Sequence, residues 1–319
     1  MITKTTHNLQ ENFCLITDSG CDLPHSYLDD EGIICIQLGF YFESDEKLIN
    51  GCDLTADEFY KRVQNGELAK TSAPSPDAFE CEFRKVLDMG RDILYIGLDS
   101  ALSTTFNSAR MAAAELKEEY PDRTILVLDS LCASAGQGML VALTKNKIKT
   151  GVSLREAYEY AENLIPKISH RFTVETLTYL CRGGRISKSA AMAGNLLNIK
   201  PVLHVNDEGK LISLYKARGR IKSLSMLLDA YEETSLTLVG RSTLAAGAEN
   251  ITIPADIPDE SENMIMISHA GCYDDAVKLS EMIKSRFNRT VDMICDIGPV
   301  IGSHAGPGTI ALFFLASER

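Results

Sequence analysis

The sequence, 319 residues long, lacks the long apolar runs that mark membrane proteins. None of its apolar stretches approaches the roughly 20 residues that a membrane-spanning helix needs. Its first twelve residues contain no apolar core of the kind found in signal peptides. We therefore expect a cytoplasmic protein with no integral membrane segment and at most a transient membrane contact.

Paired metal-binding or redox spacings are also missing. The nine cysteines are an odd number, are scattered along the chain and include no C-x-x-C pair, which argues against a zinc ribbon, a redox motif and a disulfide framework. The six histidines show no H-E-x-x-H or comparable ligand spacing. We expect no metal centre and no cofactor.

Three motifs of nucleotide and hydrolase chemistry are absent as well. The sequence has neither G-x-x-x-x-G-K-[ST] nor a G-x-G-x-x-G that opens a helix after the first apolar strand, so no phosphate-binding glycine loop is visible. It also lacks G-x-S-x-G, the nucleophile turn of α/β-hydrolases. These absences argue against an ATP site in this chain and lower the expectation of a serine hydrolase.

What is present is a chain long enough for about two domains, at roughly 150 residues each. Residues 1–165 alternate short apolar runs with helical patterns, which is typical of a parallel sheet covered by helices. Residues 166–319 mix hairpins and helices, and this mixture predicts an α+β domain with a mixed sheet. We expect an α/β protein of these two domains, with a ligand between them.

Two local features of the second half are specific enough to state. The segment N-D-E-G, residues 206–209, predicts a tight hairpin turn. A run rich in Ala, Gly and Met predicts a helix over residues 187–197.

The charge is distributed unevenly. Residues 1–165 carry 27 acids and 15 bases, whereas residues 166–319 carry 17 of each. Between residues 182 and 222 nine bases face only two acids, so this basic window is a candidate contact for an anionic partner. A solvated face with scattered salt bridges explains it equally well. The net charge of -12 disfavours nucleic-acid binding.

Short hydroxyl-rich turns are the most suggestive segments for binding. T-S-A-P-S-P places Thr71 and Ser72 ahead of a rigid Pro-Ser-Pro, and L-S-T-T places Ser103 and Thr104 at an expected strand-to-helix turn. Hydroxyls beside free backbone N–H groups suit a carboxylate or a phosphate. Helix capping is an equally good explanation for Ser103, and Ser75 has the sequence of a cap with proline at the first helical position.

Two histidines and two arginines complete the candidates. His269 ends an apolar strand in I-S-H-A-G, where it could donate to an anion or move a proton. His304, in I-G-S-H-A-G-P-G-T, repeats the arrangement, but the surrounding glycines favour a tight backbone conformation over a second ligand site. Arg182 and Arg185 flank a Gly-Gly pair and could contact a phosphate or an acidic partner.

These segments together resemble the DegV family. The resemblance covers nearly the whole chain and runs in order through I-T-D-S-G-C-D-L-P, T-S-A-P-S-P, L-S-T-T-F-N-S-A, V-L-D-S-L-C-A-S-A-G-Q-G, R-G-G-R-I-S, N-I-K-P-V-L, S-H-A-G and I-G-S-H-A-G-P-G-T. It implies a two-domain protein that holds one long-chain fatty acid between its domains. Members with an assigned role are the fatty-acid-binding subunit of bacterial fatty acid kinase.

By this resemblance the fatty-acid carboxylate is bound by Thr71, with Ser72 beside it, and by Ser103 and His269. Thr104 stands where the family usually has glycine. The same resemblance assigns Arg182 and Arg185 to docking of an ATP-binding kinase subunit. The chain is then a lipid-binding subunit and not a complete enzyme.

Two other functions stay open at this point. One is a serine-dependent hydrolase or transferase with His269 as base, and the other is a lipid carrier or sensor without a kinase partner.

Overall fold

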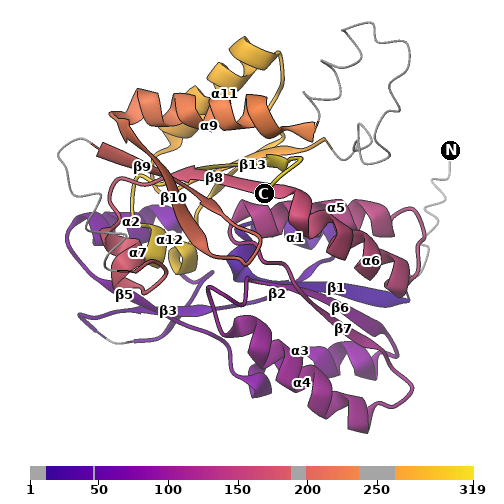
Figure 1. Cartoon of the computed structure of the whole chain (residues 1–319). Coiled ribbons are helices and arrows are strands. Elements are labelled where there is room, and N and C mark those ends of the chain that lie inside the picture. Colours follow the sequence, from indigo (N-terminus) through magenta and orange to yellow (C-terminus); the bar gives the residue numbers. More distant parts are fainter. Residues whose placement is uncertain (1–11, 46, 188–198, 237–262) are drawn as a thin grey trace, which may run out of the picture.

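The computed structural model describes residues 12–45, 47–187, 199–236 and 263–319. The helix expected over residues 187–197 lies, except for Ser187, outside these described residues. Two main sheets and one small sheet form the fold (Figure 1). This arrangement confirms the predicted α/β class, with a parallel sheet in the first half and a separate mixed sheet in the second.

The first sheet has four parallel strands in the order β2-β1-β6-β7. Their bounds are β1 Phe13–Asp18, β2 Ile34–Ile36, β6 Asp92–Gly97 and β7 Ile125–Asp129. The helices α3 (Pro76–Asp88) and α4 (Thr105–Glu119) cover one face, and α5 (Ala135–Ile148) and α6 (Leu154–Leu164) lie on the other (Figure 1). Every residue of β1 is buried, as expected for a strand covered on both faces.

The second sheet is mixed and six-stranded, in the order β10-β9-β8-β13-β11-β12. Its strands are β8 Ile168–Thr173, β9 Ile199–Val205, β10 Leu211–Arg218, β11 Ile265–His269, β12 Met293–Asp296 and β13 Ile310–Leu315. Among these described strands only β11 and β12 pair in parallel. Strands β9 and β10 form the predicted hairpin about residues 206–209. One face packs on α9 (Arg220–Thr234) and α11 (Tyr273–Phe287).

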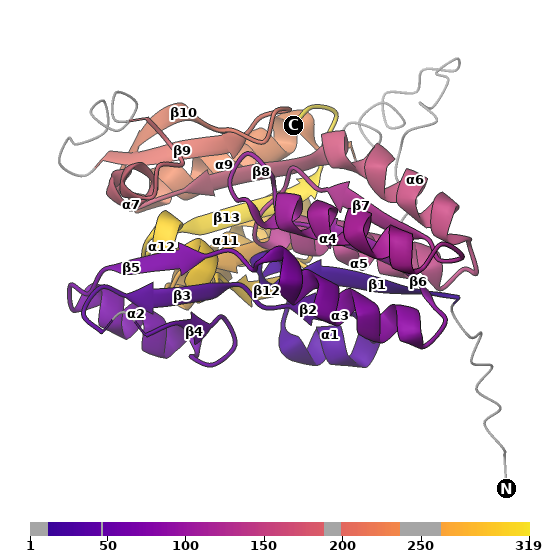
Figure 2. The ribbon, with the colours of Figure 1, turned by 90° about the horizontal axis from the view of Figure 1, so that it is seen from below.

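A small antiparallel sheet, which no pattern in the sequence predicts as a unit, brings residue 71 to the second half. It contains β4 (Ile49–Asn50), β3 (Gly39–Phe42) and β5 (Ala69–Ser72), in that order. Figure 2 shows β3 and β5 beside α12 (Pro299–Ala305), which also packs on α7 (Thr178–Arg182). The helix α2 (Ala56–Gln64) lies against the same unit.

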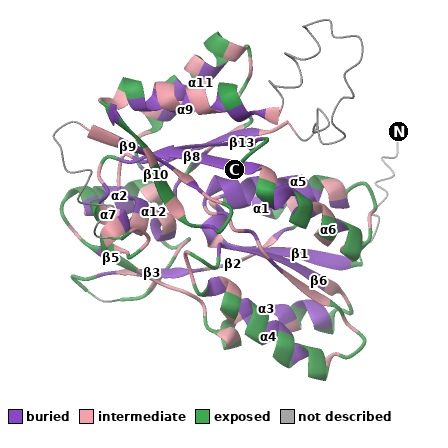
Figure 3. Cartoon of the chain, viewed as in Figure 1, coloured by how far each residue is buried: buried purple, intermediate pink, exposed green. Residues whose placement is uncertain are grey.

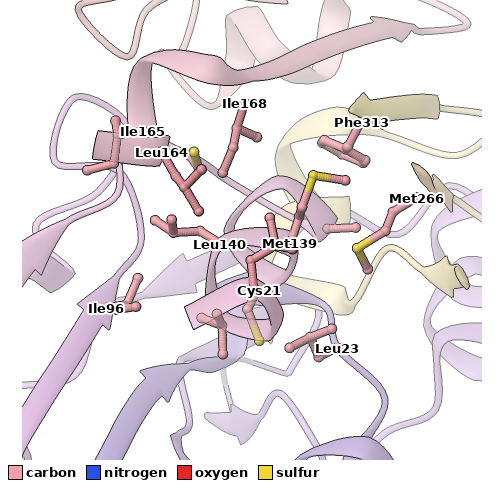
Figure 4. Packing of buried hydrophobic residues seen from close by; sticks show 14 of the residues in the cluster. Cys21, Leu23, Ile96, Met139, Leu140, Leu164, Ile165, Ile168, Met266 and Phe313 are labelled. Atoms are coloured by element: carbon pink, nitrogen blue, oxygen red, sulfur yellow. The ribbon is translucent and has the colours of Figure 1, made fainter. Parts of the chain in front are cut away.

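Helix α5 joins the two main sheets into one core. Every residue from Ala135 through Lys145 is buried, as is typical of a helix enclosed on all sides (Figure 3). Met139 and Leu140 lie among Ile96 of β6 and Phe313 of β13 (Figure 4). Both sheets therefore share a single hydrophobic cluster.

Two short 3₁₀ turns connect elements of the described chain. After β1 comes a 3₁₀ turn, Ser19–Cys21, and then α1 (His25–Glu31). A second 3₁₀ turn, Ile165–Lys167, precedes β8. Among the described residues no helix has the length and apolar character to cross a bilayer.

Candidate functional site

A cavity with about 820 Å³ of space, part of it open to solvent, lies between the two halves of the chain. Most of its wall is apolar, from Leu38, Leu98, Ala133, Val300 and Ile301 on one side to Phe172, Ala311 and Phe313 on the other. Its polar groups include Thr71, Ser72, Ser103, Arg185 and His304.

The central contact among these polar side chains joins two residues that are 233 positions apart in the sequence. The hydroxyl oxygen of Thr71, on β5, lies 2.9 Å from Nε2 of His304, on α12. The two meet because β5 packs against α12. Burial, with help from the charges of Arg185 and Arg182, lowers the pKa of His304 to about 4, so its imidazole is neutral at neutral pH.

Arg185 lies on the other side of the imidazole. Its Nη1 is 3.3 Å from Nδ1 of His304 and also donates to the carbonyl of Gly183. Its Nε and Nη2 donate to the carbonyl of Leu102, at 2.9 Å and 2.7 Å. Arg185 thus holds the Leu102–Ser103 turn beside α12, and burial lowers its pKa. Arg185 thus lies in the cavity wall, and its role in partner docking stays a prediction.

These contacts give the hydrogen bonds a direction. A guanidinium can only donate, so Nδ1 of His304 must accept from Arg185. A neutral imidazole carries one N–H, which is then on Nε2 and donates to the oxygen of Thr71. The hydroxyl hydrogen of Thr71 is left to donate to an acceptor in the cavity. The wall therefore presents a hydrogen-bond donor where a carboxylate could bind.

The other predicted hydroxyls divide into two groups. Ser103 and Ser72 line the cavity with Thr71. Ser103 also accepts from the backbone N–H of Thr105 at 3.2 Å, so it both helps to begin α4 and faces the cavity. Thr104 is exposed and does not line the cavity. Ser75 is the N-cap of α3, with Pro76 at the first position, as predicted.

His269 is not among the residues that line this cavity. Its Nε2 lies 3.4 Å from a carboxylate oxygen of Asp296, and its ring packs edge-on against Tyr273. The expected grouping of Thr71, Ser103 and His269 is corrected to Thr71, Ser103 and His304. Strand β11 ends at His269 and aims it at the neighbouring β12, whereas α12 carries His304 to β5.

The sequence did contain a weak signal for His304. S-H-A-G occurs at both histidines, so the segment itself could not discriminate between them. The glycines around His304 do serve close packing, because a Cβ on Gly306 would lie 2.3 Å from the ring of Tyr179. The glycines around His304 permit α12 to pack closely on α7, and this packing places His304 in the site. The same glycines were therefore a signal for a ligand site at His304 and not against one.

Two carboxylates at the ends of β1 and β7 are structural. Asp18 accepts hydrogen bonds from Tyr95 Oη, Leu98 N and Gly20 N. Asp129 accepts from Ser100 N and Leu131 N. Each carboxylate therefore binds the backbone of its own turn, as in capping, and also the backbone that follows the neighbouring strand β6. In the described ranges no group of three or more His, Cys, Asp or Glu side chains is arranged to hold a metal ion.

Arg182 remains on the surface. Its guanidinium stacks on the ring of Tyr179, with 4.9 Å to the ring centroid, and its side chain is exposed. Several other bases of the basic window are paired: Lys200 with Glu175, Lys210 with Glu208, and Arg220 with Asp275. Lys188 lies outside the described residues. Four exposed bases of the window show no carboxylate partner within the described part of the chain: Arg182, Lys216, Arg218 and Lys222.

Comparison with known proteins supports a single family. Residues 12–317 match the family model described as "Uncharacterised protein, DegV family". A DegV domain-containing protein of Clostridium perfringens is 38% identical over 310 residues, which is 97% of this chain and 99% of the relative.

Solved structures agree. A stearic acid-binding protein from Eubacterium ventriosum aligns with a TM-score of 0.79 at 25% identity, covering 95% of this chain and 98% of the other. A fatty acid-binding DegV family protein from Thermus thermophilus aligns with a TM-score of 0.77 at 29% identity, covering 95% and 99%. The chain described here belongs to the DegV family.

Proposed function

We propose that this protein binds one long-chain fatty acid, with the tail in the apolar part of the cavity and the carboxylate at Thr71, Ser72 and Ser103. The observation that carries the proposal is the directed chain from Arg185 through His304 to Thr71, which ends in a donor at the wall of an apolar cavity. The binding of fatty acids by the relatives from Eubacterium ventriosum and Thermus thermophilus supports it.

The physical requirements of such a ligand match this wall. A carboxylate buried without partners would be very costly, so it needs several donors at one end of the site. The tail needs apolar surface, with a gain of roughly 0.8 kcal/mol for each buried methylene group. Arg185 adds a positive charge near the hydroxyl of Thr71, from which it is separated by the ring of His304. Its own N–H groups donate to Leu102 O, Gly183 O and His304.

We further propose that the protein presents the bound carboxylate to a separate ATP-binding kinase subunit, which forms the acyl phosphate. Because the nearest donors are neutral hydroxyls, the carboxylate keeps much of its negative charge and stays able to attack a γ-phosphate. The exposed Arg182 is the last residue of α7, three positions before Arg185, which lines the cavity. On this proposal the chain performs no catalysis by itself and acts in the cytoplasm.

The alternative of a serine-dependent hydrolase finds less support. An activated serine needs a base within hydrogen-bonding reach. His304 bonds Thr71 instead of Ser72 or Ser103, and His269 is turned toward Asp296.

Substitution of the carboxylate donors tests the binding proposal. We expect Thr71→Val and Ser103→Ala each to weaken fatty-acid binding by about 1–2 kcal/mol, roughly 5- to 30-fold, because each removes one hydrogen bond to a charged group. Displacement of a fluorescent fatty acid would measure the affinity.

Thr104→Ala is the matched control, since Thr104 adjoins Ser103 but is exposed and does not line the cavity. It should bind like the wild type. If purified wild-type protein neither retains nor takes up any fatty acid, the proposal is wrong. Equal losses in Thr104→Ala and Ser103→Ala would instead contradict the assignment of the donors.

A further inference from the structure

The wall that the mixed sheet gives to the cavity has a definite end. Along β13, alternate residues point to one face of the sheet. Thr309, Ala311 and Phe313 line the cavity, whereas Leu315, the next residue on this face, does not. The lined stretch from 309 to 313 therefore covers about 13 Å of strand, at about 3.3 Å per residue.

The neighbouring strand ends its contribution at the same level. On β8, Phe172 and His170 line the cavity and Ile168 does not. His170 pairs directly with Phe313, and Ile168 pairs with Leu315. Ile168 and Leu315 are buried in the shared core, to which Phe313 also belongs, but they do not line the cavity. The cavity thus stops at one pair of cross-strand neighbours, and the next pair is solid core.

The cross-strand pair of Phe313 and His170 extends into a row over two more strands, β9 and β10. Arg171 pairs with His204 in antiparallel register, which places Val205 beside His170. Val205 in turn pairs with Leu211 of β10. Directly opposed residues share one face of a sheet, and all four of these residues line the cavity. Leu211, Val205, His170 and Phe313 form a transverse row over four adjacent strands, here called the end row.

The end row is apolar toward the cavity although it contains a histidine. Nδ1 of His170 donates to the carbonyl of Ile168 at 3.2 Å, and Nε2 accepts from the N–H of Ala133 at 3.4 Å. Both ring nitrogens are therefore occupied by backbone groups. The ring meets Phe313 edge-on, with 5.2 Å between centroids.

His170 is also held in place from α5. A Cβ on Gly136 would lie 2.1 Å from Nε2 of His170, so the helix backbone closes the space behind the ring. Such a ring cannot retreat to admit a longer ligand without moving α5.

On the basis of the proposed fatty-acid binding, we propose that the end row is the length limit for the acyl tail, with Phe313 as the residue that sets it. A tail that runs along β13 from the polar end passes Ala311 and meets Phe313. Shorter acids leave apolar wall uncovered, and longer acids have no space beyond Phe313. Each methylene group of the fatty acid that becomes buried, or can no longer be buried, changes the affinity roughly four-fold.

Competition among saturated fatty acids graded in length tests this, with native mass spectrometry to identify which acids are retained. We expect Phe313→Leu and Phe313→Ala to shift the preferred acid to longer chains, by roughly four-fold for each added methylene that is accommodated. Ala311→Leu adds side-chain volume ahead of the row and should shift the preference to shorter chains. This opposite shift keeps the test informative if Phe313→Ala does not fold.

Leu315→Ala is the matched control. It also removes core volume from the same face of β13, two residues further on, but beyond the end row, and it should leave the length profile unchanged. If Phe313→Leu and Ala311→Leu bind acids with the wild-type profile, or if Leu315→Ala shifts it as much, the length limit is not at this row. Absence of any acid from the wild type would overturn the proposed function itself, which is a different result.

Discussion

Gly183 is needed for space and not for its backbone conformation. Its φ is -71°, which any residue can adopt, but a Cβ there would lie 2.1 Å from Nδ1 of His304. Gly184, the next residue, has φ +73° and open space around its Cβ position. The two glycines of R-G-G-R therefore have different roles, one for the site and one for the turn.

This difference predicts that Gly183→Ala weakens fatty-acid binding about 5- to 10-fold, because a displaced His304 no longer orients the hydroxyl of Thr71. Gly184→Ala is the control for general disturbance of the turn, since it strains the backbone without touching His304. Displacement titrations on both variants, with thermal unfolding to check the fold, would measure this. Equal weakening in the two variants would contradict the role given to Gly183.

At the level of single residues, the sequence identified the site's hydroxyls but not its imidazole. Thr71, Ser72 and Ser103 are recognisable because short segments place them at the ends of elements. His304 and Arg185 are recognisable only through contacts with Thr71 and Leu102, which lie far away along the chain. Such contacts depend on how α12 and α7 pack, and packing is not encoded in a local pattern.

Three elements meet at the carboxyl group of Asp22. One oxygen accepts from the backbone N–H of Gly298, just before α12, at 2.9 Å. The other accepts from the hydroxyl of Ser134, just before α5, at 2.5 Å. Burial is the largest influence and raises the pKa of Asp22 from 3.8 to about 7. The carboxyl group links the turn after β1 to the starts of both helices.

The raised pKa fixes the sign of a pH effect. Between about pH 4 and pH 7 the native state binds the Asp22 proton more readily than the unfolded chain does, so this group's contribution to stability falls as pH rises. Asp22→Asn removes the titration and keeps the shape. We expect its free energy of unfolding, relative to the wild type, to increase from about pH 4 to about pH 7, by at most about 4 kcal/mol.

Urea unfolding at several pH values in this window measures the difference. Asp29→Asn, on the exposed side of α1, is the control and should follow the wild type at every pH. A constant difference between Asp22→Asn and the wild type across the window would show that Asp22 does not titrate there.

Among the elements, most strands of the two main sheets and the β9–β10 hairpin follow from sequence alone, because apolar runs and turn residues mark them. An exception is β8, whose sequence I-S-H-R-F-T contains no apolar run. The small sheet of β3, β4 and β5 does not follow from sequence alone either. Its β4 is two residues long, and β5 includes Lys70 and Thr71, so neither has an apolar pattern. Their strand conformation comes from pairing with β3.

At the scale of the whole molecule, four exposed bases in the described part of the basic window have no carboxylate partner there: Arg182, Lys216, Arg218 and Lys222. Elsewhere acids predominate, since residues 1–165 hold 27 acids against 15 bases. An anionic partner would thus be attracted mainly to one region, and charge of this kind acts chiefly on the rate of association.

If the kinase partner uses this region, Arg182→Glu should slow association several-fold at low salt, with the difference shrinking as salt screens the charges. Lys117→Glu makes the same charge change on the exposed side of α4 and should have a small effect. Stopped-flow mixing with the purified kinase subunit at a series of ionic strengths would measure both rates. A rate independent of salt, or equal slowing in both variants, would place docking elsewhere.

Because α5 is packed on both main sheets, neither half of the chain has a complete interior. The mixed sheet turns Met266 and Phe313 toward Met139 and Leu140, which precede it in the chain. A fragment made only of residues 166–319 would leave that apolar face in water. During synthesis the second half therefore completes the first, and the binding cavity cannot exist before the last strand, β13, is in place.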